Sequence, residues 1–336
     1  MSEADQIDVL SVGDIVTDAF VKLQDDQAVV YEDKEDNKWL AMPFGMKIPF
    51  DHSEVIEGVG NAANAAVSFA KLGLKSGLVA NVGEDSYGRD MISALHRNQV
   101  DARFVHINPG KLSHYHFVLW YKEERTILVN SVDYEYHWPP FRPADIPKWI
   151  YFSSVGKYAL EYHDDIADWL EEHPEVNLAF QPGTFQMSLG VERLNRIYKL
   201  TKILLVNREE AAKISGGDHD DLNGLFDRLH QLGPKVVVIT DGPDGAYASD
   251  GENRFKMPPY PDPAPPFERT GAGDAFSSAF VAAIAKGSNI EGALQWAPIN
   301  SMSVVQKVGA QAGLLTQRGI SELLEKAPEW YKPERF

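Results

Sequence analysis

Short apolar runs recur along the chain, and most of them end in turn residues that lead into a helical stretch. These runs occupy residues 8–13, 76–82, 149–153, 177–181, 203–207 and 236–240. Strands that alternate with helices predict a mainly parallel sheet with helices on both faces, which is an α/β architecture. Because ligands of such sheets bind at the carboxyl ends of the strands, we expect the functional site at that edge.

Two segments interrupt this alternation. Residues 20–50 mix apolar and acidic positions, while residues 107–134 contain two apolar runs, 114–121 and 126–129, around a charged turn that is typical of a hairpin. We expect these two segments to pair as a small β lid over the site, with residues 1–19, 51–106 and 135–336 forming the main domain. A lid would exclude water from the reaction. The alternative is a surface hairpin that shields the core or forms a dimer contact.

A glycine-rich turn leads directly into an apolar helix at residues 269–277, with the sequence RTGAGDAFS. Small residues let backbone N–H groups approach an anion, and the start of a helix adds partial positive charge. We therefore predict that the N–H groups of Gly271, Ala272 and Gly273 form an anion hole for a phosphate. Asp274 would then be the general base that takes a proton from an attacking hydroxyl. The alternative is a turn whose Asp only caps a helix.

Composition narrows the classes of partner. The net charge is −17 and the pI is near 5.0, so we expect no nucleic-acid partner and no anionic membrane, both of which need a basic face. A phosphate ligand would have to be held by backbone dipoles and a metal. The chain has no Cys, which excludes disulfides, thiolate catalysis and Cys-based metal sites. An acidic N-terminus and the lack of a long apolar run predict a cytoplasmic protein.

Four motifs together resemble the ribokinase-like (PfkB) family of carbohydrate and nucleoside kinases. They lie at residues 58–64, 207–210, 240–246 and 270–274, in the order that this family has. The resemblance extends from Val9 to about Gly313. It implies a three-layer α/β/α domain with a small β-sheet lid, ATP as phosphoryl donor, Mg²⁺, and a small sugar or nucleoside as acceptor. We also expect a homodimer formed through the lid.

The resemblance also implies roles for residues that would bind the acceptor. Asp18 corresponds to the carboxylate that accepts hydrogen bonds from acceptor hydroxyls, and Asn64 to a second polar contact. Gly60 and Asn61 would let the backbone lie against the sugar. Two alternatives stay open: Asp18 as a loop residue that caps local backbone, and Asn64 as a buried polar side chain that holds the turn.

Metal and nucleotide contacts follow from the same resemblance. Asn207 and Glu210 match the Asn-x-x-Glu pattern that organises Mg²⁺ beside the phosphates, although Glu210 could equally be a first-turn acid favoured by the helix dipole. Thr240, Gly242 and Gly245 would approach ATP, or form an ordinary β-turn. By resemblance, Asn300 would face the adenine.

One departure from the family bears on monovalent ions. Glu268 and Arg269 stand where many relatives carry an Asp and a Thr or Ser at the border of a potassium site. Activation by K⁺ is therefore left open. Arg269 is either a phosphate contact or a solvated loop cation.

The leading hypothesis is an ATP-dependent, Mg²⁺-requiring kinase that phosphorylates a hydroxymethyl group of a small sugar. A nucleoside kinase of the same family is the alternative within enzymes, and a non-catalytic sugar- or nucleotide-binding homologue is the alternative outside them. Retention of Asp274 and of the intact glycine turn favours the enzyme.

Overall fold

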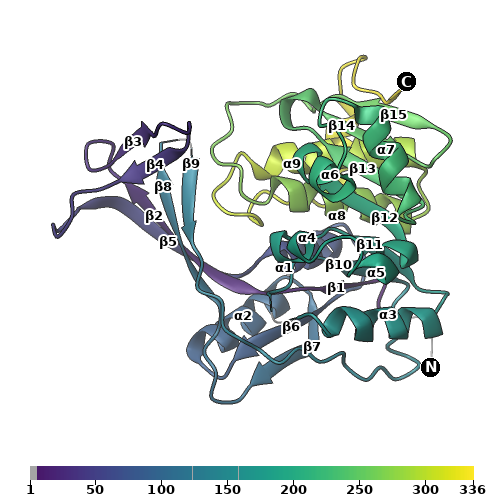
Figure 1. Ribbon diagram of the computed structural model, residues 1–336, viewed down its shortest axis with the longest axis horizontal. Coiled ribbons are helices and arrows are strands. Elements are labelled where there is room, and N and C mark those ends of the chain that lie inside the picture. Colours follow the sequence, from purple (N-terminus) through teal and green to yellow (C-terminus); the bar gives the residue numbers. More distant parts are fainter. Residues whose placement is uncertain (1–5, 123, 158) are drawn as a thin grey trace.

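A large central sheet organises the molecule. The computed structural model describes residues 6–122, 124–157 and 159–336. Ten strands form this sheet (Figure 1), in the spatial order β16 (Glu334–Arg335), β15 (Arg254–Met257), β14 (Ala246–Ser249), β13 (Val236–Thr240), β12 (Thr201–Asn207), β11 (Asn177–Phe180), β10 (Trp149–Phe152), β1 (Val9–Val12), β6 (Ser76–Gly83) and β7 (Asp101–Asn108). All pairs from β13 to β7 are parallel, and only the β13–β16 edge is antiparallel. The predicted mainly parallel sheet is confirmed.

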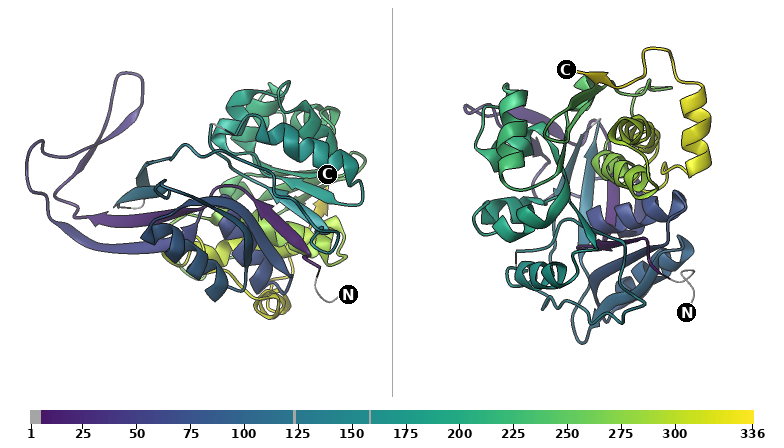
Figure 2. Two further views of the ribbon diagram at one scale, coloured as in Figure 1. Left: turned by 90° about the horizontal axis from the view of Figure 1, so that it is seen from below. Right: turned by 90° about the vertical axis from the view of Figure 1, so that its right-hand side faces the viewer.

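Helices cover both faces of the sheet, as the two layers in Figure 2 show. One face packs against α3 (Tyr162–Glu172), α5 (Asn195–Leu200), α6 (Arg208–Ser215) and α7 (Leu222–Gln231), and short α4 (Thr184–Leu189) follows β11. The other face packs against α1 (Asn61–Lys71), α2 (Ser86–Arg97), α8 (Ala272–Ala285), α9 (Ile290–Val304) and α10 (Gln317–Glu325). A 3-10 turn, η2 (Gly242–Asp244), links β13 to β14.

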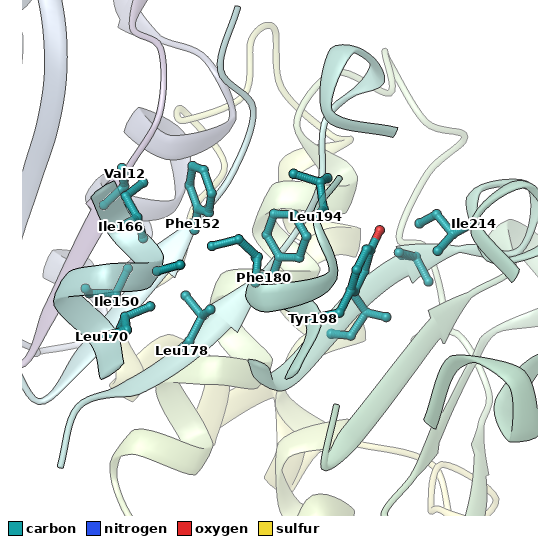
Figure 3. Close-up of a cluster of buried hydrophobic side chains, with 14 of the residues drawn as sticks. Val12, Ile150, Phe152, Ile166, Leu170, Leu178, Phe180, Leu194, Tyr198 and Ile214 are labelled. Carbon is teal, nitrogen blue, oxygen red and sulfur yellow. The ribbon is translucent and has the colours of Figure 1, made fainter. Parts of the chain in front are cut away.

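Alternation along each buried strand divides the core between the two faces. In β10, Ile150 and Phe152 point into the layer of α3 and α5, whereas Tyr151 packs against α1 and the helices beyond it. Successive side chains of a strand point to opposite faces, so a strand covered on both sides needs a continuous apolar run. Figure 3 shows the first of these layers, where Phe152 and Phe180 from neighbouring strands stack with ring centroids 5.4 Å apart.

A second sheet projects from the main body as a lid. Its four strands have the order β5 (Phe50–Val59), β2 (Val16–Leu23), β8 (Tyr115–Tyr121) and β9 (Glu124–Leu128), and a two-stranded hairpin of β3 (Val29–Glu32) and β4 (Lys38–Ala41) extends it (Figure 1). Strands β8 and β9 are the hairpin that the sequence predicts.

The boundaries of this lid differ from those expected. Strand β5 pairs with β2 almost to Val59, although residues 51–59 were assigned to the main domain, and the lid sheet already begins at Val16. Most of β5 is exposed, so its sequence lacks the apolar pattern that would predict a strand. Which sheet it joins is determined by pairing with β2. Strand β7, conversely, keeps residues 107 and 108 in the central sheet. Within the described residues, no helix is both long enough and apolar enough to span a membrane.

Candidate active site

Three adjoining pockets line the carboxyl edge of the parallel strands. The central pocket, about 240 Å³, is bordered by the ends of β11, β12 and β13 and by the start of α8. The lid pocket, about 200 Å³, lies between β1, β10 and the lid, and the outer pocket, about 720 Å³, lies between η2 and α9. Asn61 borders both the central and the lid pocket. Asn207, Thr240, Arg269 and Gly273 border both the central and the outer pocket, so the three form one continuous cleft.

Asp274 lies at the centre of this cleft, in the first turn of α8. Its Oδ1 accepts hydrogen bonds from Asn61 Nδ2 at 2.9 Å and Gln181 Nε2 at 3.3 Å, and its Oδ2 accepts one from Asn64 Nδ2 at 2.8 Å. Burial raises the pKa of Asp274 above its usual value, while these three amides act in the opposite direction. A carboxylate that is held in place and has a raised pKa is a better proton acceptor than a solvated one.

The amides around Asp274 are themselves fixed. Gln311 donates from Nε2 to Asn64 Oδ1 at 3.1 Å, and the Tyr151 hydroxyl hydrogen-bonds to Gln181 Oε1. Asn64 and Gln181 therefore present their N–H sides to the carboxylate. Asn64 is buried and borders none of the three pockets, so in this structure it holds Asp274 rather than lining a ligand cavity.

The turn before α8 brings backbone N–H groups to the wall of the central pocket. Gly271 is the N-cap with φ +77°, a conformation that favours glycine, and a Cβ there would lie 2.3 Å from Ala310 Cβ. A Cβ at Gly273 would meet nothing within 4 Å, because that position faces the cleft. The first N–H groups of a helix have no intrahelical partner, so those between Gly271 and Asp274 are suited to an anion, although Ala272 N also donates to the Arg269 carbonyl at 3.4 Å.

Asn207 and Glu210 form a reciprocal cap at the start of α6. Asn207 Oδ1 accepts from Glu210 N at 2.8 Å, and Glu210 Oε2 accepts from Asn207 N at 2.9 Å. Both side chains border the central pocket, and burial raises the pKa of Glu210, with the charges of Glu209 and Asp274 adding to that rise. Glu210 is thus an acid in the first turn of α6. Its Oε2 takes part in the cap while the residue borders the central pocket, so a role beside Mg²⁺ stays a prediction.

The donor set fits a cation that keeps most of its own water. In the described part of the chain, no three His, Cys, Asp or Glu side chains are grouped so that they could hold a metal. Mg²⁺ retains several waters and needs one or two protein carboxylates beside phosphate oxygens. Glu210 and Asn207 satisfy that modest requirement.

The outer pocket combines a glycine turn with an apolar wall. Thr240, Gly242 and Gly245 border it, and Gly245 has φ +97° with no room for a Cβ, which would lie 2.2 Å from the Met257 carbonyl. The opposite wall contains flat and apolar side chains, namely Tyr260, Phe276, Pro298, Met302 and Trp330. Such a wall suits a planar ring.

The lid pocket is rich in polar groups. Asp14 borders it and accepts a hydrogen bond from the Tyr136 hydroxyl at 2.7 Å, while burial raises the pKa of Asp14 to about 6. His114 accepts from Val132 N through Nδ1 at 2.9 Å. Its proton is thereby placed on Nε2, which is buried and has no hydrogen-bond partner among the described residues. The pocket thus offers an acceptor and a donor, the pair that recognises a hydroxyl.

Comparison with known proteins identifies the scaffold. The model of the pfkB family of carbohydrate kinases matches residues 57–317. The chain belongs to the pfkB family. The family's members are kinases, and this chain is accordingly a sugar or nucleoside kinase. The family assignment agrees with the resemblance carried by the four motifs.

Individual relatives agree with this assignment. Ribokinase of Bacillus subtilis (strain 168) is 27% identical over 281 residues, covering 79% of this chain and 87% of the relative. Cytidine kinase of Thermococcus kodakarensis is 29% identical over 256 residues, covering 74% and 88%. Arabidopsis thaliana ribokinase complexed with ribose and ATP superimposes with a TM-score of 0.77 at 20% identity, covering 95% and 99%. The expected ribokinase-like fold with its separate small sheet is confirmed.

Two residues expected at the pfkB site do not border the three pockets. Asn300 is fully buried, donating from Nδ2 to the Ala275 carbonyl at 2.9 Å and accepting from Leu315 N at 3.0 Å. It joins α8, α9 and the segment before α10, and it is absent from the outer pocket. Asp18 sits on β2 beside His116, with Nδ1 and Oδ1 3.4 Å apart, and does not border the lid pocket.

Asp14, Gln181 and Arg125 were not assigned roles from the sequence, yet all three border the cleft. Asp14 had a detectable signal, because it directly follows Gly13 at the end of the first strand. Gln181 had one as well, since it is the polar residue that ends the run at 177–181. Nothing in the sequence places Arg125, because its position depends on how the lid folds over the main domain.

Proposed function

We propose that the protein transfers the terminal phosphoryl group of ATP to a hydroxymethyl group of a small sugar. One observation carries this proposal: Asp274 borders the central pocket at a helix start suited to phosphate, and its Oδ1 accepts from Asn61, which borders both that pocket and the lid pocket with its hydroxyl-binding groups. A base must lie within hydrogen-bond reach of the proton it removes. That junction is where an acceptor hydroxyl would meet the phosphate.

Different residues along the cleft would contact the nucleotide base, the phosphates and the acceptor. Tyr260, Phe276 and Trp330 would contact the base of the nucleotide, and the N–H groups at Gly271–Gly273 would hold the transferred phosphate. The acceptor oxygen bonds to the terminal phosphorus as the bond from that phosphorus to the bridging oxygen of ADP breaks, and the hydroxyl proton passes to Asp274. Mg²⁺, placed near Glu210 and Asn207, would supply positive charge to the phosphates.

A sugar is favoured over a nucleoside by the lid pocket. The polar residues that border it are Asp14, Asn61, His114, His116, Ser131, Ser154 and Thr184, and they can bind several hydroxyl groups. Its volume of about 200 Å³ is small for a ligand cavity, which favours a single sugar ring over a nucleoside. Nucleoside kinase activity remains the second candidate because Thermococcus kodakarensis cytidine kinase is a relative of similar identity.

An ADP-release screen tests the function. Wild-type protein would be assayed with ATP and Mg²⁺ against ribose, fructose, 2-keto-3-deoxygluconate, adenosine, cytidine and inosine. We expect one of the sugars to give the highest kcat/KM. Preference for a nucleoside would favour the second candidate, and tight binding without ADP release from any acceptor would indicate a non-catalytic homologue.

Acceptor binding should depend on pH through Asp14. Its raised pKa of about 6 means that the carboxylate becomes protonated as the pH falls through that value. A protonated Asp14 accepts fewer hydrogen bonds, so the acceptor dissociation constant at pH 5 should exceed that at pH 8 by about tenfold. Calorimetry with the acceptor from the screen measures this. Asp14→Asn should abolish the step and Asp18→Asn should retain it; a step that survives in Asp14→Asn would assign the titration to another group.

Two expectations from the sequence stay predictions. Glu268 is buried, and its carboxylate accepts from Thr270 Oγ1 at 2.7 Å and Gly309 N at 2.9 Å. These protein donors already bind both carboxylate oxygens, which supports a structural role for Glu268 over a role as a K⁺ ligand. The homodimer is supported by exposed apolar side chains of the lid, namely Val29, Val30, Tyr31, Trp39, Phe44 and Phe50.

A further inference from the structure

We propose that Arg125, carried by the lid, contacts the transferred phosphoryl group and stabilises its charge in the transition state. The inference rests on the proposed function and adds a catalytic residue to it. Strand β9 brings Arg125 to the wall of the central pocket, which it shares with Asp274, Glu210 and Arg269.

The lid's contact with the main domain explains how Arg125 reaches the cleft. Arg125 pairs with Trp120 across the β8–β9 hairpin, so the two side chains lie on the same face of the lid sheet. The Trp120 ring packs edge-on against Phe267, with centroids 5.1 Å apart. Phe267 is two residues before Arg269 and is tied to α9 by its N–H, which donates to the Val305 carbonyl at 2.7 Å. The face that bears Arg125 therefore docks on the segment that leads into the glycine turn.

The charge of Arg125 has no partner among the described residues. The residue is half-buried, and in the described part of the chain its guanidinium makes no hydrogen bond or ion pair. By contrast, Arg103, Arg193, Arg196 and Arg208 are all paired with carboxylates. A partly buried cation without a partner costs free energy unless a ligand completes it. The planar guanidinium fork matches phosphate geometry.

Arg269 and Arg125 border different parts of the cleft. Arg269 borders both the central and the outer pocket, whereas Arg125 borders the central pocket alone. Arg269 is thus placed along the nucleotide, and Arg125 at its terminal phosphate. Arg125 neither gives nor takes a proton: the acceptor proton still passes to Asp274, and Arg125 stabilises the charge on the phosphoryl oxygens.

Nucleotide binding tests the contact without turnover. Arg125→Gln would be titrated by calorimetry, in the presence of Mg²⁺, with ADP and with an ATP analogue whose terminal phosphate cannot be transferred. We expect the affinity for the analogue to fall by about tenfold or more, as for a lost charge-assisted hydrogen bond, and the affinity for ADP to stay within about twofold. Equal losses for both ligands, or no loss for either, would overturn the proposal.

Lys122→Gln is the matched control. Lys122 lies on the same hairpin, is exposed and does not border the cleft, so this variant changes the lid's charge equally and should bind both nucleotides like wild type. A melting curve for each variant checks that the lid and body remain folded. If Lys122→Gln weakens the analogue as much as Arg125→Gln does, the effect is one of net lid charge and the proposed contact is refuted.

Turnover separates this inference from the proposed function. We expect kcat of Arg125→Gln to fall by at least about 10²-fold, in line with arginines that act on transferring phosphates, and Arg125→Lys to recover part of that loss. Active wild type with an equally active Arg125→Gln would refute the catalytic role of Arg125 and leave the kinase function standing. Wild type that releases no ADP with any acceptor would refute the function, and the nucleotide titration would then still decide whether Arg125 contacts the terminal phosphate.

Discussion

Asp274→Asn should lower kcat by about 10²- to 10⁴-fold, the range expected when a general base is lost. Asparagine keeps the size of the side chain but has no oxygen that can take a full proton. The amides of Asn61, Asn64 and Gln181 all donate to the carboxylate of wild type. In the variant, one of these amides must turn so that its oxygen accepts a hydrogen bond from the new NH₂ group. Steady-state kinetics with the acceptor from the screen measures the loss.

Two controls accompany this variant. Nucleotide affinity, measured by calorimetry, should stay within about threefold of wild type. The reason is that Asp274 takes the proton of the acceptor hydroxyl during the reaction and does not bind the nucleotide in the ground state. Asp244→Asn makes the same charge change on an exposed residue of η2 that borders no part of the cleft, and it should turn over like wild type. Near-wild-type turnover of Asp274→Asn would remove Asp274 from the role of base.

Gly271→Ala and Gly273→Ala should separate stability from catalysis. A Cβ at Gly271 would meet Ala310 Cβ at 2.3 Å in a left-handed backbone conformation. Backbone strain and overpacking together should lower the free energy of unfolding by about 2–5 kcal/mol. At Gly273 there is free space and ordinary helical backbone, so alanine should leave the free energy of unfolding unchanged or raise it by up to about 1 kcal/mol.

Turnover, measured on folded protein, should be affected in the opposite order, with Gly273→Ala the more damaging variant. The methyl group of Gly273→Ala would occupy the cleft wall where phosphate oxygens approach the N–H groups, so kcat should fall by about 10²-fold or more, comparable with the loss of an anion-hole donor. Denaturant unfolding and steady-state kinetics on the same two preparations give both quantities. A Gly273→Ala enzyme as active as wild type would show that no phosphate passes over these amides.

The resemblance to the pfkB family assigned Asn207 and Thr240 to the site, and the glycine turn itself indicated Gly271–Gly273; all of these residues border the cleft. The pattern of strands placed the site at the carboxyl edge of the sheet. This follows from a general property of parallel sheets, whose carboxyl ends converge on one edge whatever their side chains are. The hairpin of β8 and β9 was predicted for a similar reason, because two apolar runs around a charged turn specify their own pairing.

Contacts between distant segments could not be predicted in this way. Asp14 is held by Tyr136 and Asn64 by Gln311, and no local pattern links either pair. Asn300 and Asp18 do not border the pockets, because the position of a residue on an element does not determine the direction of its side chain, which changes with each residue of a strand and by about 100° with each residue of a helix. The lid boundary at β5 depended on its partner β2 rather than on its own sequence.

A crystal structure with Mg²⁺, a non-transferable ATP analogue and the acceptor from the screen tests the central claim most directly. The account predicts the terminal phosphate on the N–H groups of Gly271–Gly273 and an acceptor hydroxyl within hydrogen-bond distance of Asp274. A nucleotide seated away from that helix start, or an acceptor hydroxyl that meets another side chain while Asp274 keeps only its three amides, would contradict it.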